Sequence, residues 1–438
     1  MSFFLHGVHV PHRKNTEGKP LCRMECPGSV TIPMSMHIGA PAIPTVKVGT
    51  LVKIGTLIGE NKVALSSPVY ASISGKVIKI SDILLSNGAT APAVTIESDG
   101  EMALDETIVP PHVDSAESLI EAIRQSGVVG LGGAGFPTYV KFRVDPSRIE
   151  ALIVNGAECE PYITSDSHTM VARAEDMMVA FQALKKHLGI KRIIIGIEGN
   201  KKKAIASMKK LAEQDSAVEV CVLPAVYPQG GEKVLVYHTT GKVIPTGKLP
   251  IDVGCIVCNC TTLAAIGNYL QTGIPLVKKC VTVDGAAVKE PQNVVVPIGT
   301  SLADVFEFCG GFSEEPQKVL YGGPMMGIAV PNLQVPVLKN TNAILALTKK
   351  EAALPKTTAC IRCGSCTNAC PFGLAPAAIA TAYGKKDADR LETLSVNTCM
   401  ECGCCSFVCP ANRPLVQTNK LAKAFLKDEK AKEAKKNG

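Results

Sequence analysis

Residues 360–371 read CIRCGSCTNACP, and residues 399–410 read CMECGCCSFVCP. Both segments have the pattern C-x2-C-x2-C-x3-C-P, so three cysteines stand close together and a fourth lies one helical turn further along. Three thiolates at this spacing can wrap a tight turn around three corners of a cubane. The proline after the fourth cysteine ends the turn, because it has no N–H to donate. The two segments therefore predict a compact metal-binding module.

This spacing is that of bacterial ferredoxins with two [4Fe-4S] clusters, in which the fourth cysteine of each run ligates the other cluster. The first cluster is expected to bind Cys360, Cys363, Cys366 and Cys409, and the second Cys399, Cys402, Cys405 and Cys370. A structural zinc site is the alternative, but it would use four of the eight thiolates and leave the rest unexplained. Cys404 is expected to be a packed thiol, and the two clusters together would conduct single electrons.

The composition sets limits on the rest of the chain. At 438 residues and 46% hydrophobic content it is long enough for roughly three domains. The net charge of +7 comes with no basic stripe interleaved with aromatic residues, which excludes nucleic acid as a partner. The longest stretch without charge, residues 253–277, is too polar to span a membrane, and the first ten residues lack the features of a signal peptide. A cytoplasmic protein is expected.

Three further modules precede the cysteines. Residues 30–98 contain short β-branched stretches between glycine turns and resemble half of a lipoyl-type barrel. Its expected tip, SSPVYASISG (66–75), lacks the lysine that a carrier needs. Residues 112–250 alternate strand-like and helix-like pieces, which predicts a largely parallel sheet with ligands beyond the carboxyl ends of its strands. Residues 275–345 indicate another small β-rich module.

Two other groups of side chains have ligand-like spacing. A third metal site from Cys22, Cys26, Cys255, Cys258 and Cys260 is possible, but free thiols explain them more simply. His6, His9 and His12 are expected to belong to a packed N-terminal strap. Cys159 receives no role.

Residues 130–142, GLGGAGFPTYVKF, place four glycines within six residues. This density usually brings backbone close to a phosphate, yet the loop is neither the G-x-G-x-x-G fingerprint nor a Walker loop. Together with NGAECEP (155–161), YPQGGEK (227–233) and VCNCTTLAAI (257–266), it resembles the flavin and NADH site of the NADH-oxidising subunit of respiratory complex I. These segments occur in the same order along the chain.

Three more segments narrow the resemblance. GVHVPHRKN (7–15), YGGPMMG (321–327) and ECGCCSFVCPANRPL (401–415) are similar to the C subunits of the Rnf complex, a membrane-bound ferredoxin:NAD⁺ oxidoreductase that pumps Na⁺ or H⁺. The resemblance implies a multidomain α/β protein: a strap and lipoyl-like sandwiched barrel (1–110), a Rossmann-like α/β domain for FMN and NADH (111–250), a β-grasp, SLBB-type domain (251–348), an α-helical ferredoxin domain (349–420) and a charged tail (421–438).

The resemblance also implies roles for single residues toward a non-covalent FMN and NAD(H) as substrate. Gly130, Gly132, Gly133 and Gly135 would let backbone approach the flavin and its phosphate, Lys141 would supply positive charge, and Phe136 would stack beside the nucleotide. Asn155 and Glu158 match flavin contacts, Glu160 a nucleotide-side carboxylate, Gly230 and Glu232 a second glycine–carboxylate contact, and Asn259 with Thr262 the phosphate-binding turn. Val129, Leu131, Ala157 and Cys258 depart from the complex I pattern.

The function that follows is electron transfer between NAD(H), FMN and the clusters, without a catalytic side chain, since a flavin links two-electron and one-electron chemistry. The implied partners are membrane and ferredoxin-type Rnf subunits, with the chain held peripherally on the cytoplasmic side of the membrane through them. Two alternatives stay open: a cobalamin reductase of bacterial microcompartments, and a polyferredoxin scaffold whose flavin pocket has decayed.

Overall fold

Residues 29–98 form the N-terminal β module, a sandwich of two antiparallel sheets with strand orders β2-β8-β7-β4 and β3-β5-β6. The computed structural model describes residues 6–63, 65–86 and 88–437. Apolar residues alternate along these strands, so Val30, Ile32 and Ile96 are almost fully buried between the sheets. The strands are β2 (Ser29–Pro33), β3 (Ile43–Pro44), β4 (Leu51–Val52), β5 (Leu57–Glu60), β6 (Val69–Tyr70), β7 (Gly75–Leu84) and β8 (Thr90–Ser98).

The α/β domain contains a parallel sheet of order β11-β10-β9-β12 with helices on both faces. Strand β10 reads IIIGIE and is buried throughout, as expected of a central parallel strand. Its elements are α1 (Ala116–Gln125), α2 (Thr138–Phe142), β9 (Ala151–Asn155), α3 (Ser165–Ala172), α4 (Ala174–Leu188), β10 (Ile193–Glu198), α5 (Lys202–Ala212), β11 (Val218–Leu223), α6 (Glu232–Thr240), β12 (Cys255–Asn259) and α7 (Cys260–Thr272).

The predicted end of this domain at residue 250 is wrong. Strand β12 pairs in parallel with β9, and α7 packs against α4, so residues 255–272 belong to the parallel sheet and its covering helices. Gly267 allows the close packing of the two helices, because a Cβ there would lie 1.7 Å from the carbonyl oxygen of Asp176. The boundary was hard to predict from the sequence, because β12 and α7 form one apolar stretch and no charged linker separates it from the next module.

The second β module is a mixed sheet of order β1-β14-β13-β17-β15-β16. Strand β1 (Leu21–Arg23) comes from the N-terminal segment and pairs in parallel with β14, so the chain's beginning is part of this sheet. The other elements are β13 (Lys278–Asp284), β14 (Gln292–Pro297), α8 (Leu302–Phe308), β15 (Lys318–Tyr321), β16 (Ile328–Ala329) and β17 (Ala343–Leu347).

The helical module carries both cysteine runs. Its helices are α9 (Lys349–Ala352), α10 (Ser365–Asn368), α11 (Pro376–Gly384), α12 (Ala388–Thr393), α13 (Cys404–Phe407) and α14 (Leu415–Asn437). The predicted separate tail from residue 421 is wrong, because α14 continues through it. Ala422 and Leu426 are buried in the core of the module. The first turns of the predicted tail therefore present an apolar stripe between their charged residues.

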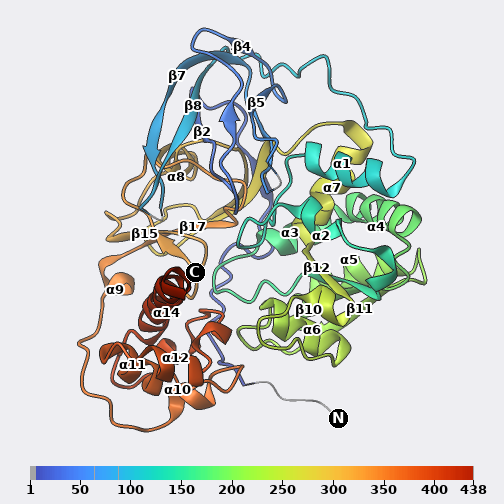
Figure 1. The fold of residues 1–438 in the computed structure, drawn as a ribbon. Coiled ribbons are helices and arrows are strands. Elements are labelled where there is room, and N and C mark those ends of the chain that lie inside the picture. The colour runs from blue at the N-terminus through green and yellow to red at the C-terminus, as the bar shows by residue number, and fades with distance from the viewer. Residues whose placement is uncertain (1–5, 64, 87, 438) are drawn as a thin grey trace.

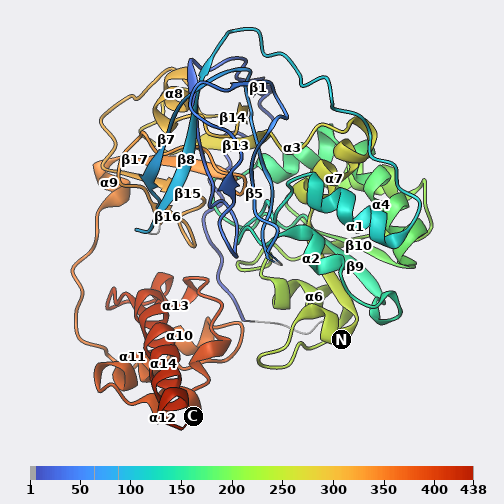
Figure 2. The ribbon, with the colours of Figure 1, turned by 45° about the horizontal axis from the view of Figure 1, so that its top comes forward.

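The modules meet around a central recess. Figures 1 and 2 show the two β modules on one side, the α/β domain on the other, and the helical module below them at the end of a long segment that follows α9. The N-terminal strap, residues 6–17, crosses between them. It packs through buried Val8 and Val10, while His6, His9 and His12 are exposed.

Helix length and hydropathy bear on the membrane. Within the described residues, no helix combines the length and apolar character needed to cross a lipid bilayer. Residues 1–5, half of the start in which no signal peptide is expected, lie outside the described residues.

Candidate functional site

The glycine loop rests on the N-terminus of α7. Asn259 caps this helix by accepting from the N–H of Thr262, and the hydroxyl oxygen of Thr262 accepts from the N–H of Leu131 at 3.0 Å. A Cβ on Gly132 would lie 2.5 Å from the side-chain nitrogen of Asn259, so only glycine fits there. A helix N-terminus with free N–H groups beside a glycine loop is an anion-binding arrangement. The structure therefore brings together three residues predicted to bind the flavin phosphate.

Asp166 orients this helix start. One of its carboxylate oxygens accepts from the side-chain N–H of Asn259 at 2.7 Å, and the other accepts from the hydroxyl of Thr261 at 2.7 Å. Asp166 itself is buried at the beginning of α3. It fixes the amide of Asn259, so that the oxygen caps α7 and the nitrogen faces the glycine loop.

Three other elements hold the same loop from outside the α/β domain. The ammonium of Lys279, on β13, donates to the carbonyl of Leu131 at 3.0 Å, and Asn340 donates to the carbonyl of Gly133 at 2.9 Å. The N–H of Ile38, from the N-terminal β module, donates to the carbonyl of Gly135. Gly130 and Phe136 close the loop, since the N–H of the first donates to the carbonyl of the second at 2.8 Å. Both β modules thus contact the glycine loop of the α/β domain through hydrogen bonds.

A second group of predicted residues lies at the same sheet edge. Lys141, on α2, donates to the carbonyl of Val257 at 2.7 Å and lies 3.6 Å from the carboxylate of Glu232. Asn155, at the end of β9, donates to the carbonyl of Gly230 at 2.9 Å. Asn155 comes from the carboxyl end of β9, Glu232 from the beginning of α6 and Lys141 from α2, so they gather beyond the carboxyl ends of the strands.

The carboxylate of Glu158 is buried and forms hydrogen bonds within the protein. Its side chain is 2% exposed, and one oxygen accepts from the N–H of Asp166 at 2.6 Å while the other accepts from the hydroxyl of Ser167. It therefore caps the N-terminus of α3, with Lys201 4.0 Å away. Burial raises the pKa of Glu158, an effect that Lys14 and Lys201 oppose. The predicted flavin contact of Glu158 stays a prediction, and its visible role is to shape the loop.

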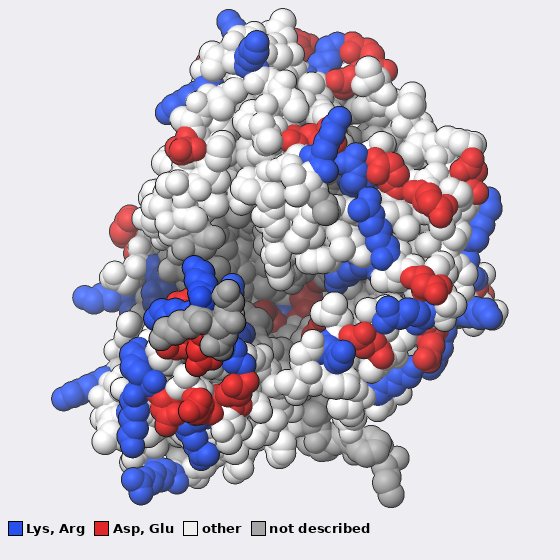
Figure 3. All heavy atoms as spheres, viewed as in Figure 1, with Lys and Arg blue, Asp and Glu red and all other residues white. Residues whose placement is uncertain are grey.

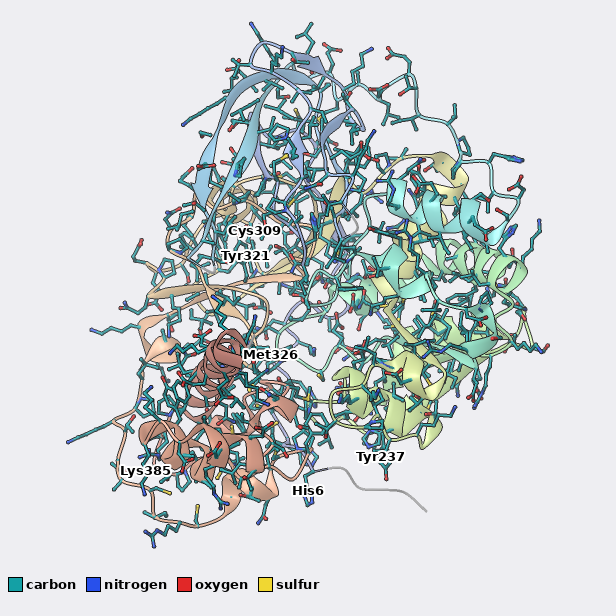
Figure 4. All side chains as sticks on the ribbon, viewed as in Figure 1. His6, Tyr237, Cys309, Tyr321, Met326 and Lys385 are labelled. Atoms are coloured by element: carbon teal, nitrogen blue, oxygen red, sulfur yellow. The ribbon has the colours of Figure 1, made fainter. Side chains whose placement is uncertain are left out.

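Glu160 faces the other way, toward the second β module. Its two oxygens accept from the N–H groups of Met325 and Met326 at 3.0 and 2.8 Å. Burial raises the pKa of Glu160 to about 7, and these two N–H donors oppose the increase. Figure 4 labels Met326 where the helical module approaches the α/β domain.

Glu160 also lines the recess between the modules. This cavity of about 600 Å³ is bordered by Gly132, Gly133, Tyr321 and Lys420 among others. Figure 3 shows the surface hollowed between the β modules, the helical module and the α/β domain. A Cβ on Gly133 would meet nothing within 4 Å, so the tip of the glycine loop is open. Its backbone is thus accessible to a ligand.

Lys14 fixes the loop that carries both glutamates. Its ammonium donates to the carbonyls of Glu158, Glu160 and Ile163 at 3.1, 2.8 and 2.5 Å. Burial lowers the pKa of Lys14 to about 8, while the nearby Glu158 opposes the decrease. Through Lys14, the N-terminal strap therefore holds the loop of Glu158 and Glu160 in place.

The expected ligands of the second cluster surround one cavity. Its lining includes Cys370, Cys399, Cys402 and Cys405, although Cys370 comes from the first run and the others from the second. The crossed pattern expected from ferredoxin spacing thus places these four residues around one cavity. Among the described residues, no three His, Cys, Asp or Glu side chains are grouped so that they could hold a single metal ion. Cys404 also lines this cavity, but it is fully buried and its thiol lies 3.9 Å from the carbonyl of Tyr227, as expected for a packed residue.

The expected ligands of the first cluster differ in exposure. Cys360 and Cys363 are exposed, whereas Cys366 is buried in an apolar cluster that also contains Cys405 and against which Cys409 packs. A structural zinc would need four thiolates about 2.3 Å from one ion, whereas each thiolate of a cubane binds a different iron. The second group, drawn from both runs around one cavity, suits a cubane better than a zinc ion.

The second cysteine run packs directly on the α/β domain. The hydroxyl of Tyr227 donates to the carbonyl of Cys402 at 2.6 Å, and Tyr227 is 2% exposed. A Cβ on Gly231 would lie 2.3 Å from the methyl group of Met400. The loop that carries Gly230 and Glu232 is therefore in contact with the loop that carries Cys399 and Cys402.

Sequence reasoning missed Lys14, Asp166, Lys279 and Asn340. Only Lys279 left a signal: it occupies an inward position of the alternating strand KKCVTVD, where a lysine is unexpected. The other three act over long sequence separations, through carbonyls and amides that no motif records.

Four family models match the chain in order. The RnfC barrel sandwich hybrid domain matches residues 2–101, the Nuo51 FMN-binding domain residues 123–268, the SLBB domain residues 280–329 and a 4Fe-4S dicluster domain residues 356–413. The second match extends past residue 250, in agreement with the sheet. These matches confirm the predicted fold classes, with FMN and [4Fe-4S] clusters as the cofactors of the matched domains.

Whole-chain relatives decide the family. The C subunit of the proton-translocating ferredoxin:NAD(+) oxidoreductase complex of Clostridium ljungdahlii is 42% identical over 88% of this chain and 85% of its own length. The chain belongs to the RnfC family. The Na(+)-translocating counterpart of Acetobacterium woodii is 42% identical over 96% of both chains. The C subunit of the ion-translocating oxidoreductase complex of Rhodobacter capsulatus is 38% identical over 97% of this RnfC chain and 83% of its own.

The residues present in this RnfC chain fit both cofactors. Thiols are the donors that iron–sulfur clusters require, and the four expected ligands of the second cluster line one cavity together with Cys404. The glycine loop, the α7 N-terminus and the Lys141 ammonium offer close backbone, N–H groups and positive charge, which suit a flavin phosphate. Among solved structures, an alignment with a chain of an NAD⁺-reducing [NiFe]-hydrogenase covers 71% of this chain and 53% of that one, at 20% identity and a TM-score of 0.47.

Proposed function

We propose that this chain is the peripheral electron-transfer subunit of an Rnf complex, which exchanges hydride with NAD(H) at FMN and single electrons with two [4Fe-4S] clusters. The observation that carries the proposal is the contact between Tyr227 and Cys402. It joins the loop expected to hold the flavin to the loop expected to hold a cluster. Two separate cofactor domains would need no such contact, whereas an electron path does.

The bound flavin supplies conversion between two-electron and one-electron chemistry. Oxidation of NADH releases two electrons and one proton, and clusters held by the cysteine runs would carry those electrons one at a time; reduction of NAD⁺ would need the opposite flow. The residues of the chain itself would bind the flavin and orient its ring. The α7 N-terminus and Lys141 would hold the phosphate and the polar edge of the ring. Asn155 and Gly230 would form the floor of the flavin pocket.

The cysteine positions support an order for the clusters. Cys402, one of the four cysteines around the second cavity, packs with Tyr227, so this second cluster would be next to the flavin. Cys360 and Cys363 of the first cluster are exposed on the outer side. The first cluster would therefore exchange electrons with a ferredoxin-type partner protein.

Coupling to Na⁺ or H⁺ translocation would belong to the membrane proteins of the complex. The relatives of Clostridium and Acetobacterium are named for different ions, so the chain's family is compatible with either. The substrate of the proposal, NAD(H), is a cytoplasmic nucleotide. We therefore assign the chain to the cytoplasmic side of the membrane, held there by its partners.

The test is an anaerobic NADH titration of the full chain with reconstituted clusters and added FMN, followed by absorbance and electron paramagnetic resonance (EPR). The expected result is bleaching of bound flavin together with signals of reduced clusters. Asn259→Ala should lose FMN, because it removes the cap of α7 and the amide beside Gly132. Asn268→Ala, on the same helix but bonded only to Thr272 of that helix, is the matched control.

Other outcomes would favour the alternatives. If flavin binds and only a donor other than NADH reduces it, the nucleotide role of Phe136 and Glu160 is wrong and a cobalamin reductase becomes the better interpretation. If no flavin is retained, a polyferredoxin scaffold remains.

A further inference from the structure

Helix α14 places an amide against the cavity of the second cysteine group. Asn419 is 1% exposed and lines this cavity together with Cys370, Cys399, Cys402 and Cys405. Its side-chain nitrogen lies 3.6 Å from the sulfur of Cys399, a hydrogen-bonding distance for sulfur. Its side-chain oxygen is buried without a partner among the described residues. A buried amide that satisfies only one of its atoms is costly, and needs an explanation other than packing.

The first cysteine group has no such amide at the matching described position. Asn419 stands ten residues after Cys409, and the residue ten positions after Cys370 is Ala380. Ala380 packs against the apolar cluster that contains Cys366 and Cys409. The two halves of the module are therefore alike in spacing but differ at this position, with a hydrogen-bond donor in one half and a methyl group in the other.

A lysine strengthens the difference. Lys423, one turn further along α14, donates to the carbonyl of Cys399 at 3.0 Å and to the carboxylate of Glu401 at 2.6 Å. The matching position in the first half, fourteen residues after Cys370, is Gly384. At these two matching positions, an amide donor and an ammonium group paired with Glu401 thus lie beside the second group and not beside the first.

We propose that Asn419 tunes the second cluster by donating its amide N–H to the thiolate of Cys399, which raises the reduction potential of that cluster. A donor to a ligating sulfur withdraws negative charge and so stabilises the reduced, more negative form of the cluster. The proposal rests on the cluster assignment of the proposed function. On this proposal, the chain raises the reduction potential of the cluster expected beside the flavin and not that of the other cluster.

The test is a mediated redox titration of the reconstituted full chain, monitored by EPR with dithionite as reductant and no NADH. Asn419→Leu keeps the branching at Cγ and removes the donor, and Asn419→Ala removes it without adding bulk. In both variants one of the two cluster midpoints should move to a more negative potential and the other should stay. Gln417→Ala, an exposed amide on the same helix, should move neither.

The results distinguish failure of this role from failure of the cluster assignment. Two clusters with unmoved midpoints, or with both midpoints moved equally, would overturn the role of Asn419 and leave the proposed function intact. A wild-type chain with fewer than two clusters would overturn the ligand assignment and this inference with it.

Discussion

The hydroxyl of Tyr227 donates a hydrogen bond to the carbonyl of Cys402, and the two residues are separated by 175 positions in the sequence. Tyr227 begins the loop that carries Gly230 and Glu232, while Cys402 lies in the second cysteine run. Two neighbouring contacts support the bond: Gly231 packs on Met400, and a Cβ on Gly403 would lie 2.9 Å from the carbonyl of Met325. The contact fixes the distance between the expected flavin and the expected second cluster.

Tyr227→Phe should slow the transfer of electrons from NADH to the clusters, because loss of the hydroxyl loosens the loop that holds Cys402. FMN and iron content should not change, and the loss of stability should be about 1 kcal/mol. Stopped-flow absorbance measures the rate. Tyr70→Phe loses a comparable hydroxyl–carbonyl bond, to Gln125, far from the cysteines and should leave the rate unchanged; equal slowing in both variants would refute the prediction.

Cys399→Ser should cost one of the two clusters, because serine is a poor ligand for iron in these sites. Cys404→Ala, five residues away, should keep both, since its thiol points to the carbonyl of Tyr227. Iron and sulfide analysis with EPR gives the count. Loss of a cluster in Cys404→Ala would mean that the second run uses a different set of three cysteines.

Lys279→Met should weaken FMN binding about tenfold, a change of about 1.4 kcal/mol. The buried carbonyl of Leu131 would lose its charged donor, and the glycine loop would relax. Fluorescence titration with FMN measures the affinity. Lys278→Met, at the exposed neighbouring position, is the matched control, and an equal loss there would point to net charge rather than to the loop.

Lys14→Met should destabilise the chain by about 2 kcal/mol, because three carbonyls lose one charged donor. It should also weaken FMN retention, since those carbonyls belong to the loop of Glu158 and Glu160. Thermal unfolding and flavin release measure the two effects. Lys19→Met removes a single bond to the exposed carbonyl of Pro291 and should have little effect on either.

The pKa of Glu160, raised to about 7, predicts a pH effect on stability. Between the ordinary glutamate pKa of 4.5 and about 7, the folded chain holds a proton that the unfolded chain has released, so stability falls as pH rises through this window and is level above it. Glu160→Gln cannot titrate, and its melting temperature relative to wild type should therefore rise from pH 5 to about pH 7. Glu314→Gln, an exposed carboxylate, should show no such trend.

Local patterns in the sequence determined the elements and the cofactor classes. Cysteine spacing predicted the ferredoxin-type module, short β-branched stretches between glycine turns predicted the N-terminal antiparallel strands, and the alternation of strand-like and helix-like pieces predicted a parallel sheet. The glycine loop, with the resemblance of four segments, predicted an FMN-binding domain. These features follow from residues within a few turns of one another, where spacing alone fixes geometry.

Tertiary structure decided what the charges do. Lys14, Lys279 and Asp166 act on residues more than 90 positions away, and no spacing rule reports such contacts. Glu158 and Glu160 look equivalent in NGAECEP, yet one caps α3 and the other meets Met325 and Met326, because their side chains leave opposite sides of the same loop. The sequence alone determined which groups the chain can hold; only packing between modules brought the loop of Cys402 against the loop of Gly230 and left Cys360 and Cys363 exposed.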